Sequence, residues 1–158
     1  MQPTADVIVL RPDEGTQLPR PETGGAVVIK LAGESSQGAI TIYESTRRPG
    51  DSGGPDPHRH WRFAEMFYVL EGEYLFEVND ETIRAPVGTF LFIPPGAIHS
   101  MRSVGKEVGR LLTMCVPGGI EQYFAEVAHL PSGSVNAATI GLIGRKHGID
   151  FVRAPAEE

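Results

Sequence analysis

The sequence predicts an all-β protein, either a sandwich or a barrel of short strands. The middle of the chain, roughly residues 26–116, is a series of apolar runs that are too short for typical helices. These runs are rich in β-branched and aromatic residues, and Gly or Pro interrupts the chain between them. Several short strands separated by closely spaced turns are typical of all-β sandwiches and barrels.

The expected strands follow one another along this central region. They cover residues 26–31, 39–46, 65–70, 73–78, 89–94, 98–104 and 109–116. The short apolar run at residues 7–10 (VIVL) is a candidate for one more strand, which could pair with a partner subunit. Residues 11–25, RPDEGTQLPRPETGG, have the composition of a loop.

The end of the chain has a different periodicity and predicts a helical tail over residues 119–152. Within residues 119–130, apolar side chains recur at a spacing close to that of a helix, and Pro131 ends the pattern. A second, weaker helix is expected over residues 135–147. Gly148 suits the left-handed position that commonly follows a helix.

Length and composition describe an ordinary globular protein. A chain of 158 residues fits one domain, residues 1–158, and can bury a sizeable core. The net charge of −6 argues against nucleic acid or an anionic membrane surface as a partner. The single cysteine, Cys115, and the absence of a secretory-signal pattern at the start predict a cytoplasmic location.

Two histidines and a glutamate form the first group of candidate metal ligands. His58 and His60 are one residue apart, so on a strand both side chains point to the same face. Glu65 follows five residues after His60, and a continuous strand would turn it to the opposite face. A turn or bulge within residues 61–64 is therefore required if all three side chains converge.

His99 supplies the second part of the candidate site. It begins a strand directly after a rigid Pro-Pro-Gly turn at residues 94–96. Three imidazoles and one carboxylate form a mixed nitrogen and oxygen site that suits Fe, Mn, Co, Ni, Cu or Zn. Positions left to water or substrate make such a site open rather than purely structural.

These residues occur in two stretches that resemble the two motifs of the cupin superfamily. Residues 58–72, HRHWRFAEMFYVLEG, match the first motif from its His-x-His pair through Glu to the closing Gly. Residues 88–103, GTFLFIPPGAIHSMRS, match the second motif from its Gly through Pro-x-Gly to His. Ser103 stands where the second motif ends in Asn. The tail resembles that of small, single-domain bacterial cupins of the quercetin dioxygenase-like group.

The resemblance implies both a fold and a cofactor. The fold is the cupin barrel, a double-stranded β-helix or jelly roll, with one or two short C-terminal helices. The cofactor is one divalent transition metal. Its implied ligands are His58, His60, Glu65 and His99. In such enzymes the residue at the position of Glu65 is also the catalytic base, and small cupins commonly pair as homodimers through N-terminal strands.

Strand alternation predicts an apolar pocket around this metal. Counting from Glu65, from the next strand and from His99 gives the inward-facing candidates. The candidate substrate-binding residues are Phe67, Val69, Tyr74, Phe76 and Met101. For any single one of them, the simpler interpretation is a core side chain.

Three classes of function remain open. The first is a quercetinase-like dioxygenase that acts on a small aromatic or enolic molecule with dioxygen, with Glu65 accepting a hydroxyl proton. The second is a non-redox metalloenzyme, an isomerase, epimerase, cyclase or lyase, in which the metal is a Lewis acid. The third is a cupin that binds a small molecule without turnover.

Overall fold

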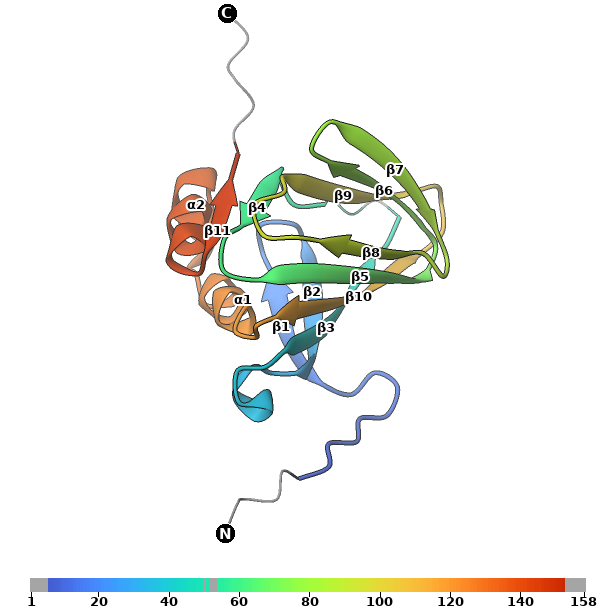
Figure 1. Ribbon diagram of the computed structural model, residues 1–158. Helices are drawn as coiled ribbons and strands as arrows, with labels where there is room; N and C mark the ends of the chain where they lie inside the picture. The colour runs from blue at the N-terminus through green and yellow to red at the C-terminus, as the bar shows by residue number, and fades with distance from the viewer. Residues whose placement is uncertain (1–5, 50, 52–53, 153–158) are drawn as a thin grey trace, which may run out of the picture.

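The computed structural model describes residues 6–49, 51 and 54–152, which form two antiparallel sheets and two short helices (Figure 1). The first sheet has six strands in the order β1-β2-β3-β10-β5-β8. These strands are Thr16–Arg20 (β1), Gly25–Leu31 (β2), Thr41–Arg47 (β3), Gly109–Val116 (β10), Ala64–Glu71 (β5) and Phe90–Ile93 (β8).

The second sheet has five strands in the order β11-β4-β9-β6-β7. These strands are Ile149–Phe151 (β11), His58–His60 (β4), His99–Val104 (β9), Glu73–Val78 (β6) and Glu81–Pro86 (β7). The prediction of an all-β protein is therefore confirmed. The two sheets are not joined by hydrogen bonds into one closed barrel.

One of the two core clusters among the described residues lies between the two sheets. Inward side chains of β5, β8 and β10 pack there against inward side chains of β6 and β7. The buried members are Phe67, Val69, Tyr74, Phe76, Ala85, Leu91, Ile93 and Leu111. A second cluster, which includes Tyr43, Phe63 and Cys115, joins the six-stranded sheet to the helices.

The two predicted C-terminal helices form, but the expected helical tail ends earlier than residue 152, because Ile149–Phe151 is strand β11. Helix α1 covers Glu121–Ala128 and helix α2 covers Ala137–Lys146. The Asn136 side chain caps α2 by accepting a hydrogen bond from the Thr139 amide at 3.0 Å. Gly148 follows α2 with φ of 81°, the left-handed conformation expected there. No helix among the described residues is long and apolar enough to cross a membrane.

The prediction for the N-terminal region is wrong for residues 11–25, and the pairing of residues 7–10 with a partner subunit stays a prediction. Residues 11–25 were expected to be loop, but Thr16–Arg20 forms β1 and pairs antiparallel with β2. Pro19 is tolerated because β1 is an edge strand, where a missing amide proton costs no ladder bond on the open side. Residues 7–10, the candidate strand, are exposed and have no strand pairing in this chain.

Two strands carry no clear signal in the sequence. Strand β7 is half polar and forms because it pairs with β6 across a tight turn at Asn79, where φ is 53°. Strand β11 has only three residues, and it pairs with β4. This second pairing matters for the site, because it supports the short strand that carries His58 and His60.

Candidate metal centre

The chain changes sheets between His60 and Glu65, which explains the irregular spacing of the motif. His58 and His60 lie on β4 of the five-stranded sheet, whereas Glu65 lies near the start of β5 in the six-stranded sheet. The residues between the strands form the predicted break, in which Trp61 is exposed. The carboxylate therefore approaches from the opposite sheet and faces the imidazoles.

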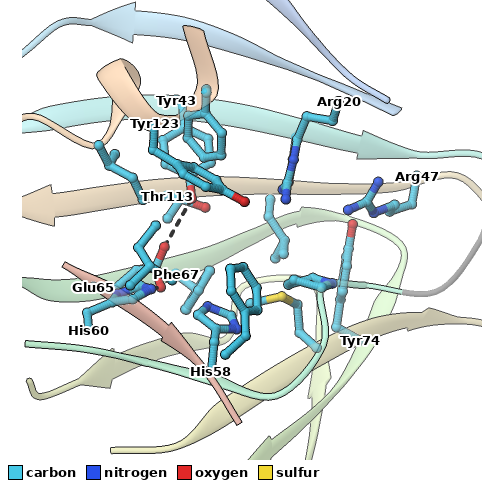
Figure 2. A pocket seen from close by; sticks show the side chains of 18 residues that line it. Arg20, Tyr43, Arg47, His58, His60, Glu65, Phe67, Tyr74, Thr113 and Tyr123 are labelled. Atoms are coloured by element: carbon cyan, nitrogen blue, oxygen red, sulfur yellow. Dashed lines mark hydrogen bonds and ion pairs between the residues drawn. The ribbon is translucent and has the colours of Figure 1, made fainter. Parts of the chain in front are cut away.

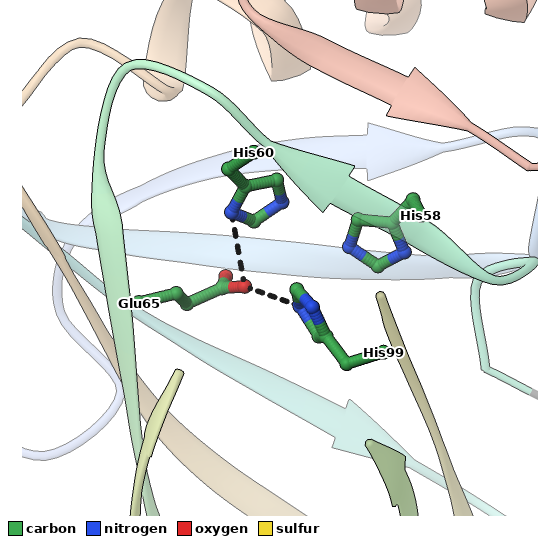
Figure 3. Close-up of side chains that lie close together, drawn as sticks. All are labelled: His58, His60, Glu65 and His99. Carbon is green, nitrogen blue, oxygen red and sulfur yellow. Dashed lines mark hydrogen bonds and ion pairs between the residues drawn. The ribbon is translucent and has the colours of Figure 1, made fainter. Parts of the chain in front are cut away.

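The four candidate ligands meet between the sheets (Figure 3). Their ligand atoms all lie within 4.8 Å of one another, and all four residues are buried. Oε2 of Glu65 lies 3.0 Å from Nε2 of His99 and 3.4 Å from Nδ1 of His60. The rings of His58 and His99 are 4.4 Å apart, consistent with the direct pairing of these two residues across β4 and β9.

Backbone carbonyls orient two of the imidazoles. Nδ1 of His58 lies 2.8 Å from the carbonyl oxygen of Asp56, and Nδ1 of His99 lies 3.1 Å from that of Ala97. A carbonyl oxygen can only accept, so each Nδ1 carries the proton and each Nε2 is available to a ligand. Contacts of this kind are the usual way in which proteins orient metal-binding histidines.

His99 and Glu65 form a contact that needs a cation. Both ring nitrogens of His99 face acceptors, the carbonyl oxygen of Ala97 and the carboxylate of Glu65. A neutral imidazole has only one N–H, so either a second proton or a metal ion must lie between Nε2 and the carboxylate. Burial lowers the pKa of His99, but the hydrogen bond and the charge of Glu65 outweigh it and raise the pKa overall.

The ionisation states also suit metal binding. Burial lowers the pKa of His58 to about 3 and also lowers the pKa of His60, so both imidazoles are neutral at pH 7. For Glu65, burial raises the pKa, but His60 and the hydrogen bond from His99 bring it down to about 2. The site therefore presents an ionised carboxylate and imidazole lone pairs, the protonation states that metal ligands need.

Tyr43 and Cys115 contact the other carboxylate oxygen of Glu65. The Tyr43 hydroxyl donates to Oε1 at 3.0 Å, and Sγ of Cys115 lies 3.8 Å from the same oxygen. Burial, reinforced by the charge of Glu65, raises the pKa of both groups, so both stay protonated and can donate. Sequence reasoning missed Tyr43, although its inward position on an alternating strand could have marked it.

The dimensions of the cluster fit a divalent transition ion. With metal–ligand bonds of about 2.1 Å, neighbouring ligand atoms lie about 3 Å apart and opposite ones about 4.2 Å apart. The present separations, all within 4.8 Å, need only small side-chain shifts to reach these values. Three nitrogen donors and one oxygen donor leave the choice among the late first-row ions open.

A cavity of about 50 Å³ lies next to the cluster (Figure 2). Three of the five predicted pocket residues line it, namely Phe67, Tyr74 and Met101. Val69 and Phe76 instead belong to the packed core between the sheets. A larger hollow of about 1000 Å³ adjoins the cavity. The two share Arg20, Pro55, Tyr123 and Phe151 in their walls.

Two cationic residues in the cavity wall were not found from the sequence. Arg20 lies in β1, within the segment expected to be loop, and Arg47 is the last residue of β3, one position beyond the expected strand. Both are buried, with 8% of each residue exposed. Arginine is seldom buried in proteins unless it is paired. Sequence reasoning therefore places an arginine on the surface, and only the fold shows that these two lie in a cavity.

Comparisons with known proteins agree with the two-sheet architecture. Residues 44–115 match the family model described as Cupin domain. A predicted oxalate decarboxylase from Thermotoga maritima is 22% identical with a TM-score of 0.60, over 69% of this chain and 98% of that one. KdgF from Halomonas sp. is 19% identical with the same TM-score of 0.60, over 71% and 96%. These solved structures show the fold, which is the cupin fold.

Matches to curated relatives are shorter. The germin-like protein subfamily T member 3 of Arabidopsis thaliana is 38% identical over 80 residues, which are 48% of this chain and 34% of that protein. An uncharacterized protein of Methanocaldococcus jannaschii is 28% identical over 60 residues, 38% and 48% of the two chains. This chain thus matches less than half the length of either relative.

Proposed function

From a cupin fold that gathers three buried imidazoles and a carboxylate beside a cavity, we propose that this chain is a metal-dependent enzyme acting on a small organic molecule. The proposed metal ligands are His58, His60, Glu65 and His99. The observation that carries the proposal is the convergence of four buried ligand residues, in which the contact between Glu65 and His99 needs either a second proton or a metal ion between Nε2 and the carboxylate.

The residues around the cluster define what each group can do. A bound divalent transition ion supplies Lewis acidity and, if redox-active, oxidative chemistry. Glu65 is the proposed catalytic base, because its ionised carboxylate can accept the proton of a substrate hydroxyl. Tyr43 fixes Oε1 of that carboxylate by its 3.0 Å hydrogen bond, which leaves Oε2 directed at the imidazoles.

The leading reaction class remains a dioxygenase that takes an aromatic or enolic substrate. Its support is the complete set of three histidines and one glutamate, together with the aromatic side chains Phe67 and Tyr74 in the cavity wall. Pockets for drug-sized molecules measure about 300–1,000 Å³, whereas this cavity measures about 50 Å³. This volume suits a small enol beside the metal, whereas an entire flavonol such as quercetin would have to extend into the adjoining hollow of about 1000 Å³.

The same volume favours the second candidate, a non-redox isomerase, epimerase, cyclase or lyase. Such an enzyme needs only a small hydroxyl- or carbonyl-bearing substrate, which a polarising metal and one base can process. The same four ligands serve, and Glu65 moves the proton. Metal identity separates the two classes, because Zn excludes electron transfer at the metal and Fe or Mn permits it.

Oxygen uptake by protein loaded separately with Fe(II), Mn(II), Co(II), Ni(II) and Zn(II) tests the choice. The substrates are quercetin and a series of small enols. Uptake that depends on the metal and disappears in Glu65→Ala supports the dioxygenase. Metal-loaded protein that consumes no oxygen but exchanges substrate hydrogen with D₂O supports the non-redox enzyme. Tight binding without either reaction points to a binding protein, and failure to retain any metal refutes the proposal.

We also propose that the chain forms a homodimer. Val7, Ile8 and Val9 are exposed apolar residues with no partner strand in this chain, and Phe90 and Phe92 are exposed on β8, an edge strand. Exposed apolar edges of this kind commonly mark an interface between subunits. Light scattering should give twice the mass of the chain, and Phe92→Glu should shift it toward the monomer. A wild-type monomer at high concentration contradicts the proposal.

A further inference from the structure

A second group of buried polar side chains lies in the same cavity, apart from the candidate metal ligands (Figure 2). It consists of two guanidinium groups and two phenol hydroxyls. The four residues are Arg20, Arg47, Tyr74 and Tyr123, with exposed fractions of 8%, 8%, 1% and 2%. None of them takes part in the metal-ligand cluster.

Strand β3 runs from the metal cluster to Arg47 of this group. Inward positions on β3 are Tyr43, Ser45 and Arg47, and all three line the cavity. Tyr43 contacts the candidate ligand Glu65, so it marks the metal end. Arg47 is four residues further along, a distance of about 13 Å between Cα atoms at strand geometry. The cavity therefore has a metal end and a cationic end.

Among the described residues, no carboxylate pairs directly with Arg47. Its one side-chain hydrogen bond within that part of the chain is a long one, 3.4 Å from Nη1 to Oγ1 of Thr23. Burial and the neighbouring charge of Arg20 lower the pKa of Arg47, and the more distant charges of Asp51 and Glu22 oppose this effect without cancelling it. Arg20 itself is paired, because its guanidinium lies 2.7 Å from Oε1 of Glu22. Arg47 is thus a buried cation without a directly paired carboxylate in the described structure, which is costly unless a ligand compensates it.

Two buried phenol hydroxyls lie beside the arginines. Among the described residues, the Tyr74 hydroxyl has no hydrogen-bond partner. The Tyr123 hydroxyl has none of good geometry, and Arg20 is the group near enough to interact with it. Figure 2 shows the Tyr74 hydroxyl directed at the Arg47 guanidinium, and the two groups influence each other's pKa. Burial raises the pKa of Tyr123 to about 12, although the nearby Arg20 lowers it. Buried hydroxyls without partners are rare in native structures and indicate a missing acceptor.

Two glycines, Gly25 and Gly109, leave space for these polar groups because they have no Cβ atom. A Cβ atom on Gly25 would lie 2.7 Å from Nη1 of Arg47, and one on Gly109 would lie 2.7 Å from the Tyr74 hydroxyl. Larger residues at either position would push the guanidinium or the phenol out of place. The positions of both groups therefore depend on glycine in neighbouring strands.

We propose that this end of the cavity binds a carboxylate group of the substrate, and that the substrate is a small dianionic organic acid. The inference rests on the proposed function, in which a divalent ion lies at the metal end of the cavity. The head of the substrate binds that ion through its oxygen atoms, and the distal carboxylate reaches the cationic end. Glu22 is the one carboxylate among the described residues that pairs directly with either arginine, and Asp51 acts on Arg47 only from an exposed position. One buried positive charge therefore remains without direct pairing at this end, and at the other end a divalent ion exceeds Glu65 by one charge. A dianion compensates both, and a planar carboxylate can accept from a guanidinium and a phenol together.

Calorimetric titration of Zn(II)-loaded protein tests the inference without any turnover. The probes are malate, 2-hydroxyglutarate and 2-hydroxyadipate, each compared with the 2-hydroxy monocarboxylate of equal chain length. Both members of a pair carry the same metal-binding head, so the difference reports the distal carboxylate alone. For the best-fitting length we expect the dicarboxylate to bind about 10- to 100-fold more tightly.

Variants at the cationic end should remove that preference. Arg47→Met keeps the volume of the side chain and should make the paired probes bind equally. Arg84→Met, an exposed arginine paired with Glu73, is the matched control and should retain the preference. Tyr74→Phe should weaken dicarboxylate binding several-fold while leaving the thermal stability of the free protein unchanged or higher, because the hydroxyl has no partner there. If the Tyr74 hydroxyl were only structural, its removal would lower the thermal stability together with the affinity for dicarboxylates.

Metal content, measured on the same samples, distinguishes the two possible failures. If wild-type protein holds zinc but binds mono- and dicarboxylates equally at all three lengths, the carboxylate site is refuted and the metal centre stands. If the protein holds no zinc, the proposed function fails, and the titrations are repeated on the metal-free chain. A preference for dicarboxylates that depends on Arg47 then supports the anion site alone, and its absence overturns both proposals.

Discussion

Replacing Tyr43 with phenylalanine isolates the support that the candidate metal centre receives from its surroundings. The change removes the hydroxyl that donates to Oε1 of Glu65 at 3.0 Å and keeps the ring, whose edge-on contact with Phe124 has a centroid distance of 5.0 Å. A buried hydrogen bond to a charged group contributes about 1.5–3 kcal/mol. Glu65 is ionised in the metal-free protein, so the loss applies there as well.

The expected effect is large enough to measure in two ways. At about 2–4 °C per kcal/mol for a chain of this size, the melting temperature of the metal-free protein should fall by about 3–12 °C. Competitive titration should show a metal affinity lower by about 10- to 100-fold, the usual cost of losing a residue that holds a ligand in place.

Tyr74→Phe provides the matched control, because the Tyr74 hydroxyl is equally buried but has no partner in the described structure. It should leave both the melting temperature and the metal affinity unchanged or slightly higher. If Tyr43→Phe and Tyr74→Phe behave alike in both assays, the hydrogen bond to Glu65 does not stabilise the site, and the reasoning is refuted.

Four further substitutions have definite expected outcomes. Glu65→Ala and His99→Ala should each reduce metal content sharply while the circular dichroism of the β-sheets stays the same; full occupancy in both would show that the ligands are wrongly assigned. Asn136→Ala removes the cap of α2 and should lower the unfolding free energy by about 1 kcal/mol in chemical denaturation. Gly144→Ala would place a Cβ atom 3.0 Å from the carbonyl oxygen of Ile149, so it should displace β11, destabilise the protein by about 1–3 kcal/mol and weaken metal binding through β4. An unchanged melting temperature for this variant would mean that β11 tolerates the displacement.

The sequence alone determined the fold class and the four candidate ligands. Alternating apolar runs and their turns identify strands such as β6 and β10 because burial of one sheet face imposes a period of two. The ligand pattern was visible for a similar reason. His58 and His60 keep that period on β4, so strand alternation alone puts both side chains on one face. A rigid turn precedes His99 and fixes where its strand begins.

Only the tertiary structure decided the parts of the site that depend on pairing between distant segments. Strand β1 looks like a loop because its residues have little β propensity, and it forms only because β2 offers a free edge. That pairing brings Arg20 into the cavity, where it meets Arg47 from β3 and Tyr74 from the other sheet. Whether a buried charge or hydroxyl finds a partner depends on side chains from segments that are far apart in the sequence. A local sequence pattern does not show which of these side chains come into contact.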